Sequence, residues 1–136
     1  MRRYTLDASG LVRYFVDLLP SDADAVVSDA FAGEAVLELP VIAASEAMYI
    51  AYNRDEIAGR PFKGSPEDVV TILKADHPIV LAETDLAVLE AVLDWQDEFP
   101  SQLHDAMIIA SHEVSETEAV ITSDGKIGDH VPTVWD

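Results

Sequence analysis

The chain has 136 residues, and 49% of them are hydrophobic, which is typical of a single folded domain (residues 1–136) and argues against intrinsic disorder. It has 26 acidic and 8 basic residues, a formal net charge of -18, and no cysteine, which excludes disulfides, thiolate zinc sites and iron–sulfur clusters. No apolar run approaches the ~18 residues of a membrane span, and the amino terminus lacks the apolar segment of a signal peptide. We therefore expect a cytoplasmic protein without membrane association.

The acidic residues are spread along the whole chain and do not form a tail. In dilute buffer such a charge repels both itself and nucleic acid. At 1 M salt the Debye length falls to ~3 Å, so repulsion between distant charges vanishes. We favour adaptation to a salt-loaded, halophilic cytoplasm, and binding to a basic partner is the alternative.

The first half of the chain alternates between strand and helix patterns. Its predicted elements are a strand at 4–6, helices at 8–19 and 22–32, a strand at 35–39, a helix at 41–57 and a loop at 59–64. Gly33 ends the predicted helix at 22–32, and Gly59 follows the predicted helix at 41–57.

The second half continues the alternation. Ser65 caps a helix that begins at Pro66, and a strand follows at 78–81. The remaining predicted elements are a helix capped by Thr84 with Leu86, Leu89, Val92 and Leu93 inward, a helix capped by Ser101 and running to about 114, a strand at 119–122 and an edge strand at 133–135. This order predicts an α/β domain with a mainly parallel, doubly wound sheet.

Two acids follow predicted strands. Asp7 ends the first strand, and Asp124 follows the strand at 119–122. In open α/β sheets, ligands bind outside the carboxyl ends of the strands. If the two strands are close neighbours, both carboxylates point into one crevice.

Two further acids lie on apolar helical stripes. Glu46 has Ile42 and Ile50 one turn away on either side, and Asp105 is followed one turn later by Ile108 and Ile109. A buried carboxylate shifts its pKa or binds a cation. The chain has too few lysines and arginines to neutralise four such groups, so a divalent Mg²⁺ or Mn²⁺ ion is the economical solution.

Each of the four acids also has an ordinary structural interpretation. Asp7 can cap a helix, and Glu46 can reach water from the edge of its stripe. Asp105 can be a first-turn acid favoured by the helix dipole, and Asp124 precedes Gly125 in a common turn pair. Only together, on one side of a doubly wound sheet, do they indicate a metal site.

The order of these acids resembles a known family, the PIN-domain nucleases. The segments that resemble its four motifs are Tyr4 to Ser9, Pro40 to Glu46, Leu103 to Ala110 and Val120 to Asp124. One departure is clear: many members carry a second Asp two residues after the fourth acid, where this chain has Lys126 and then Ile127. Asp129 is a candidate substitute.

The resemblance implies a three-layer PIN-like fold with a five-stranded parallel sheet flanked by helices. It also implies Mg²⁺- or Mn²⁺-dependent cleavage of RNA. At this length, the most similar group is the toxin half of VapBC-type toxin–antitoxin pairs. An antitoxin protein partner and a homodimer follow from that group.

The expected chemistry uses Asp7, Glu46, Asp105 and Asp124 as ligands of one or two divalent ions that activate a water for attack on the scissile phosphate. Ser9, Thr122 and Ser123 are supporting candidates. The candidates for phosphate contacts are Arg13, Arg54, Arg60 and Lys63, expected as a rim beside the metal site, and isolated surface charges are the alternative.

Several other side chains carry two interpretations. His104 adjoins Asp105 and is a candidate for proton transfer, and His112 shares its helical face, although packed or solvent-facing histidines are more common. Tyr49, Tyr52 and Trp95 can stack on bases, but aromatic residues at helical spacing usually belong to the core.

Two other functional classes stay open. A receiver-like phosphotransfer domain also uses an Asp after its first strand, and Lys126 fits its late lysine, but Asp7 lacks a paired acid and no Asp follows a middle strand at the right place. A non-catalytic interaction module would share the fold and the spacing of the acids. Dependence on metal separates that module from the enzyme.

Overall fold

The computed structural model describes all 136 residues, and its centre is one parallel sheet in the order β5-β2-β1-β6-β7. The strands are β1 (Arg2–Leu6), β2 (Ala35–Pro40), β5 (Ile79–Ala82), β6 (Val120–Ile121) and β7 (Thr133–Val134). Tyr4 of β1 pairs with Leu37, and Thr5 pairs with Val120. The strand order reverses between β1 and β6, so the carboxyl ends of these two strands form the switch-point crevice of the sheet.

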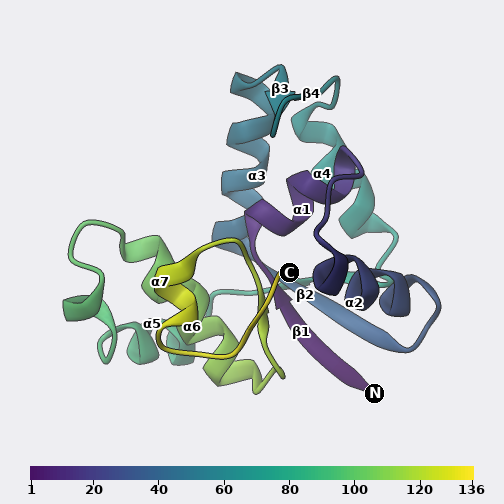
Figure 1. Ribbon diagram of the computed structural model, residues 1–136. Coiled ribbons are helices and arrows are strands. Elements are labelled where there is room, and N and C mark those ends of the chain that lie inside the picture. Colours follow the sequence, from purple (N-terminus) through teal and green to yellow (C-terminus); the bar gives the residue numbers. More distant parts are fainter.

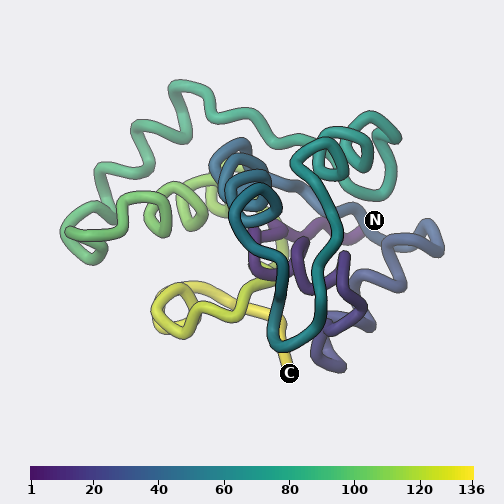
Figure 2. The backbone as a smooth tube through the Cα atoms, turned by 90° about the horizontal axis from the view of Figure 1, so that it is seen from above, coloured from purple at the N-terminus to yellow at the C-terminus, as the bar shows by residue number.

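Helices cover both faces of the sheet. They are α1 (Ala8–Phe15), α2 (Ser21–Phe31), α3 (Val41–Asn53), α4 (Pro66–Lys74), α5 (Leu86–Val92), α6 (Leu103–Ser115) and α7 (Gly125–Gly128), with a 3₁₀ turn η1 (Gln96–Glu98). In Figure 1, α5, α6 and α7 lie to the left, α2 lies to the right, and α1, α3 and α4 stand above β1 and β2. Figure 2 shows α5 and α6 side by side, in agreement with their extensive contact. None of the helices has the length and apolarity needed to cross a membrane.

The core is built from a buried central strand and a helix with small side chains. Leu37 and Leu39 of β2 are fully buried. Ala43, Ala47 and Ala51, spaced one turn apart, form the buried face of α3. Small side chains allow close approach of a helix to its neighbours, and α3 contacts α1, α4 and α6. The position of Glu46 is therefore fixed by a tightly packed helix.

The predicted helix over 41–57 is too long, and the predicted loop after it is wrong. The helix ends at Asn53, and β3 (Glu56–Ile57) pairs in antiparallel fashion with β4 (Arg60–Pro61). Ala58 and Gly59 connect these strands with φ angles of 50° and 83°. Positive φ at both central residues is the requirement of a two-residue type I′ hairpin. This hairpin continues the projection of α3 at the top of Figure 1.

Three other predicted boundaries differ from the structure. The first helix ends at Phe15, before Asp17 adopts a left-handed φ of 57°. Asp85 caps α5 in place of Thr84, because its carboxylate accepts a hydrogen bond from the Val88 N–H at 3.1 Å. Ser101 does not cap the next helix, since α6 begins at Leu103 after Gln102.

The predicted inward face of α5 is also largely wrong. Val88 and Val92 are buried, whereas Leu86, Leu89 and Leu93 are exposed by 70%, 50% and 63%. These leucines therefore form an apolar stripe on the outer face of α5. The predicted cap at Ser65 and the helix start at Pro66 are confirmed, with the Asp68 carboxylate accepting from the Ser65 N–H at 2.8 Å.

Gly10 makes the close approach of α1 to the sheet possible. A Cβ atom there would lie 2.8 Å from Leu6 Cδ1 and 3.2 Å from Ile121 Cγ2. We expect Gly10→Val to lower the free energy of unfolding by about 1–3 kcal/mol, measured by urea denaturation, because overpacking forces these neighbours apart. Gly125→Ala, where a Cβ meets no atom within 4 Å, is the matched control. Equal stability of the two variants would contradict the close packing.

Candidate active site

A cavity of about 370 Å³ opens at the carboxyl ends of β1 and β6. All four acids selected from the sequence line it, although they come from four separate segments of the chain. Its polar lining residues are Asp7, Ser9, Arg13, Glu46, Arg54, His104, Asp105, Thr122, Ser123 and Asp124. Asp129 follows α7 as an exposed residue and does not line the cavity. Asp124 is therefore the only acid from this segment in the lining.

Asp7 is both a helix cap and a cavity residue. Its Oδ1 accepts a hydrogen bond from the Ala8 N–H at 2.8 Å, which caps α1. Its Oδ2 accepts from the Thr122 hydroxyl at 2.7 Å. The two interpretations of Asp7 are therefore compatible, since the cap fixes the carboxylate at the cavity.

The segment after β6 is joined to the start of α1 by short hydrogen bonds. The Thr122 hydroxyl accepts from the Asp124 N–H at 3.1 Å while it donates to Asp7. The Ser9 hydroxyl accepts from the Ser123 N–H at 3.2 Å. Asp124 caps α7 through the Lys126 N–H at 2.8 Å. The three supporting candidates thus hold the first and fourth acids in a fixed relation.

Asp105 is the most unusual carboxylate of the cavity. It lies in the first turn of α6 and is only 4% exposed. Its Oδ1 lies 3.3 Å from Nε2 of His104, whereas its buried Oδ2 has no hydrogen-bond partner. Buried polar atoms are almost always paired, so an orphaned carboxylate oxygen points to a missing donor or cation.

Burial and mutual repulsion raise the pKa of three of these acids. Burial is the main cause for Asp7, opposed by the hydrogen bonds from Thr122 and Ala8. For Glu46, burial and the charge of Asp7 raise the pKa, opposed by His104 and Arg54. For Asp105, burial and then the charge of Asp124 raise the pKa to about 6. The four carboxylates of the cavity therefore outnumber its two arginines, Arg13 and Arg54.

The donor chemistry fits a hard divalent cation. Carboxylate oxygens are the ligands that Mg²⁺ and Mn²⁺ prefer, and one buried oxygen of Asp105 has no hydrogen-bond partner. The side chains are not already gathered for that purpose, because no three of the acids and histidines form a cluster that could hold one ion. An ion held directly by three of these side chains would thus require side-chain rotation.

Two of the four basic candidates reach the cavity. Arg13 and Arg54 line it, and the Arg13 guanidinium also donates to the Leu18 carbonyl at 3.2 Å. Arg60 and Lys63 instead line a separate cavity of about 500 Å³ between the end of α1 and the hairpin. Arg60 donates to the Val16 carbonyl at 2.7 Å, so it holds the hairpin against α1.

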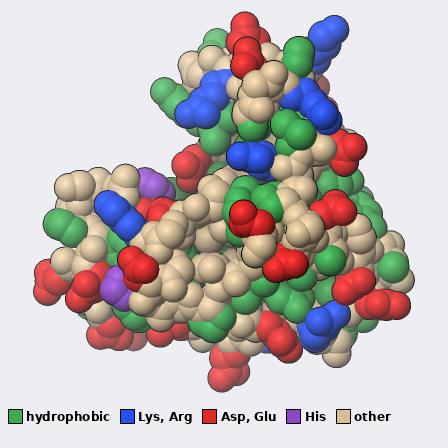
Figure 3. All heavy atoms as spheres, viewed as in Figure 1, with side chains coloured by type: hydrophobic (Ala, Val, Ile, Leu, Met, Phe, Trp, Pro, Cys, Tyr) green, Lys and Arg blue, Asp and Glu red, His purple; other side chains and the backbone are tan.

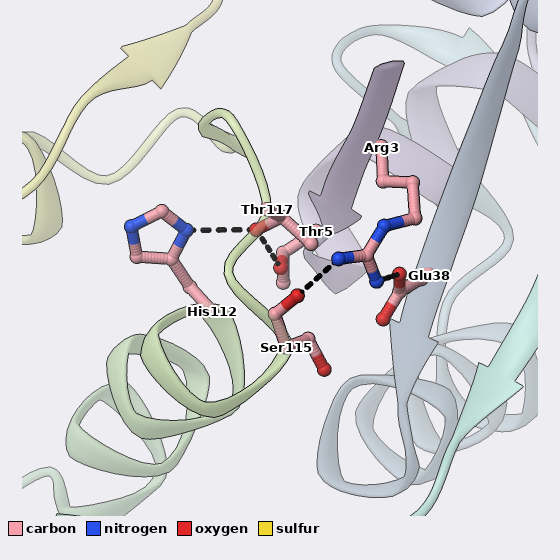
Figure 4. A network of polar contacts seen from close by, with 6 residues as sticks. All are labelled: Arg3, Thr5, Glu38, His112, Ser115 and Thr117. Atoms are coloured by element: carbon pink, nitrogen blue, oxygen red, sulfur yellow. Dashed lines mark hydrogen bonds and ion pairs between the residues drawn. The ribbon is translucent and has the colours of Figure 1, made fainter. Parts of the chain in front are cut away.

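The two histidines on α6 occupy different environments. His104 lines the carboxylate cavity, whereas His112 is buried far along the helix, and burial lowers its pKa. Figure 4 shows its Nδ1 paired with the Thr117 hydroxyl at 2.7 Å, which in turn pairs with Thr5 at 2.8 Å.

The same network contains an ion pair that the sequence analysis did not select. Arg3 pairs with Glu38 at 2.6 Å and donates to the Ser115 carbonyl, as Figure 4 shows. Glu38 is a buried acid in a central strand. An acid among the apolar residues of a predicted strand could have indicated a paired cation. The network fastens the carboxyl end of α6 to β1 and β2, and so helps to position Asp105 at its other end.

The three aromatic candidates lie outside the cavity lining. Tyr49 and Tyr52 are 69% and 80% exposed on α3, so the expectation that they belong to the core is wrong. Trp95 packs edge-on against His130 and donates to Glu113. The lining residues that the sequence did not indicate for the site are the apolar Val12, Ile50, Ile57 and Ala58.

Comparison of the sequence with protein-family models and with curated proteins gave no match. Solved structures are similar over nearly the full length. VapBC2 from Rickettsia felis, bound to a promoter DNA fragment, matches with a TM-score of 0.67 and 12% identity, covering 98% of this chain and 99% of that one. A toxin–antitoxin complex from Klebsiella pneumoniae matches with a TM-score of 0.66 and 17% identity, covering 96% and 95%.

A third similar structure is VapC20 of Mycobacterium tuberculosis, a toxin that cleaves the sarcin–ricin loop, with a TM-score of 0.62, 13% identity and 93% coverage of both chains. At such low identity the likeness establishes the fold. The predicted PIN-like fold, with a five-stranded parallel sheet between helical layers, is therefore confirmed.

The raised pKa of Asp105 predicts that removing its charge stabilises the protein. Its pKa is about 6 in the folded state, against the ordinary value of 3.8 that we assign to the unfolded chain. Ionisation of Asp105 therefore lowers the free energy of unfolding as pH rises from about 4 to 6, and the loss is complete above pH 6. We expect Asp105→Asn to raise the free energy of unfolding at pH 7.5, in EDTA, by up to roughly 3 kcal/mol.

Urea denaturation at several pH values measures this effect. The gain should shrink as pH falls below 6, because the wild-type carboxyl is then protonated in the folded state. Asp94→Asn, at an exposed position, is the matched control. A gain that is the same at pH 4 and pH 7.5 would show that ionisation is not its cause.

Proposed function

We propose that this protein is a metal-dependent endoribonuclease and the toxin component of a VapBC-type toxin–antitoxin pair. The observation that carries the proposal is the gathering of four carboxylates from four segments in one cavity, with a buried oxygen of Asp105 left unpaired. Clustered acids with raised pKa values are typical of functional sites. The similar structures include toxin–antitoxin complexes and a toxin that cleaves the sarcin–ricin loop, which supports the same class of function.

The metal would be held by Asp7, Glu46, Asp105 and Asp124. A bound Mg²⁺ or Mn²⁺ ion supplies Lewis acidity that activates water and screens charge on the phosphate. The protein's part is to favour the ionised form of Asp7 through hydrogen bonds from Thr122 and the Ala8 amide, and to hold Asp124 beside it. His104 lies next to Asp105 and is within reach of a proton exchanged at that carboxylate.

The RNA backbone would meet the cations nearest the carboxylates. Arg13 and Arg54 line the cavity, and Arg54 already opposes the raised pKa of Glu46. Figure 3 shows further Lys and Arg side chains on the projecting lobe, to which Arg60 and Lys63 belong by sequence. Acidic and histidine side chains lie at the notch where that lobe meets the helices on the left. Phosphates would thus pass beside the lobe toward the acids.

We also propose an antitoxin partner, a homodimer and a cytoplasmic setting, where RNA is available. The matched toxin–antitoxin complexes support the first of these. The exposed leucines of α5 and the exposed tyrosines of α3 are apolar surface of the kind that protein partners cover. A halophilic origin is proposed from the charge of -18.

A second candidate is a non-catalytic interaction module with the same fold. The observation that favours it is the lack of a preformed cluster of three metal ligands. The two candidates differ in their response to metal: the enzyme gains both cleavage and stability, and the module gains neither.

Metal-dependent cleavage is the direct test of the proposed function. Purified protein should cut labelled single-stranded and structured RNAs in Mg²⁺ or Mn²⁺, and EDTA should abolish cutting. Asp7→Asn and Asp105→Asn should reduce cleavage to background, because each removes a negative ligand from the cavity. Asp94→Asn, at an exposed position outside the cavity lining, should cut like the wild type.

Thermal unfolding of the same proteins supplies a second readout. Mn²⁺ should raise the midpoint of the wild type and of Asp94→Asn, and less so that of Asp105→Asn. If folded wild type shows neither cleavage nor stabilisation by metal, the interaction module is the better description.

The thermal stability of the protein should depend on salt. Only two arginines pair with acids, Arg2 with Asp29 and Arg3 with Glu38, so screening weakens far more repulsion than attraction. Raising KCl from 0.1 to 1 M should increase the thermal midpoint by on the order of 5 °C. A neutral osmolyte at matched osmolality is the control. An unchanged or lower midpoint in KCl would remove the support for a salt-adapted protein.

A further inference from the structure

A second hollow adjoins the carboxylate cavity and extends beyond the residues of the proposed cleavage chemistry. It has a volume of about 340 Å³ and is lined by Ile42, Ser45, Glu46 and His104. Glu46 and His104 also line the carboxylate cavity, so these two side chains form a shared wall. A molecule bound at the acids would therefore extend directly into this hollow.

The wall residues are held from two helices. Ile42 and Glu46 lie one turn apart on α3, and Ser45 adjoins them at an exposed position. His104 comes from the first turn of α6, which contacts α3. Its Nε2 lies 3.3 Å from Asp105, and its side chain is 43% exposed. The imidazole is thus oriented by the acid, while part of its surface stays available to a ligand.

The charge of the hollow restricts what it can bind. Its single charged group is Glu46, which disfavours a phosphate, and its lining contains no lysine or arginine. A neutral, flat group of moderate size is compatible with Ile42, the imidazole face and one hydroxyl from Ser45. Small-ligand pockets of a few hundred Å³ commonly combine apolar walls with a few polar groups.

We propose that this hollow receives the unstacked base of the nucleotide next to the cleaved phosphate, with His104 stacking on the base. The inference rests on the proposed nuclease function and specifies its substrate as single-stranded RNA. Single-stranded RNA is recognised by splayed bases stacked on aromatic side chains, histidine included. His104 is then a specificity residue that couples the position of a base to the position of the phosphate at the acids.

An abasic scan tests the hollow. The cleaved bond is first mapped in a single-stranded RNA oligonucleotide, and an abasic nucleotide is then placed at each position around it. An abasic nucleotide at one position next to the bond should slow wild-type cleavage by roughly tenfold. The same series, read as binding to the Asp7→Asn protein by fluorescence anisotropy, should show weaker binding at that position.

Variants separate stacking from other roles of His104. His104→Ala should cut intact RNA about tenfold more slowly and lose its sensitivity to the abasic position. His104→Phe keeps an aromatic face and should retain the scan profile. Ser45→Leu fills the hollow and should resemble His104→Ala, whereas Ser28→Leu, at an exposed serine of α2, should match the wild type.

The outcomes distinguish the two proposals. A flat abasic profile, or equal defects in His104→Ala and His104→Phe, overturns the base site. Metal-dependent cleavage in the same experiments would still support the nuclease function. A hollow that binds a protein side chain instead gives the flat profile. Absence of both cleavage and RNA binding overturns the nuclease and the base site together.

Discussion

Repulsion among carboxylates that share a partly buried cavity is the constraint on which the rest of this structure depends. Burial and neighbouring acids raise the pKa values of Asp7, Glu46 and Asp105, and Asp105 has one oxygen without a partner. In a chain of net charge -18 this arrangement is unfavourable unless rigid elements hold it. Several buried polar contacts of the fold therefore hold these acids in place.

The acids are fixed from both ends of the elements that carry them. At the crevice, one hydroxyl of Thr122 binds Asp7 and receives the Asp124 amide, which joins the ends of β1 and β6. At the far end of α6, the His112–Thr117–Thr5 chain and the Arg3–Glu38 pair fasten the helix to the sheet (Figure 4). Asp105 is thereby held on a helix that cannot easily tilt away from the other acids.

The features that sequence could predict are those set by local pattern. Asp7 follows a strand, Glu46 and Asp105 interrupt apolar stripes, and the parallel order of the strands brings these positions together. The β3–β4 hairpin was missed because its turn depends on a positive φ at Ala58, a residue that gives no turn signal. The exposed leucines of α5 and the attachment of Arg60 to the Val16 carbonyl depend on tertiary neighbours, which helical periodicity does not specify.

The distribution of the few cations has a consequence for the proposed chemistry. Arg2 and Arg3 are paired with acids, and Arg60 holds the hairpin, so these three are not free to bind an incoming phosphate. Arg54 differs, because it lines the cavity and favours the ionised form of Glu46. A divalent ion at the acids would take over that role, which would release the Arg54 guanidinium toward the RNA backbone. In so acidic a protein, a metal bound at the acids would therefore favour RNA binding, and by linkage bound RNA would favour the metal to the same extent.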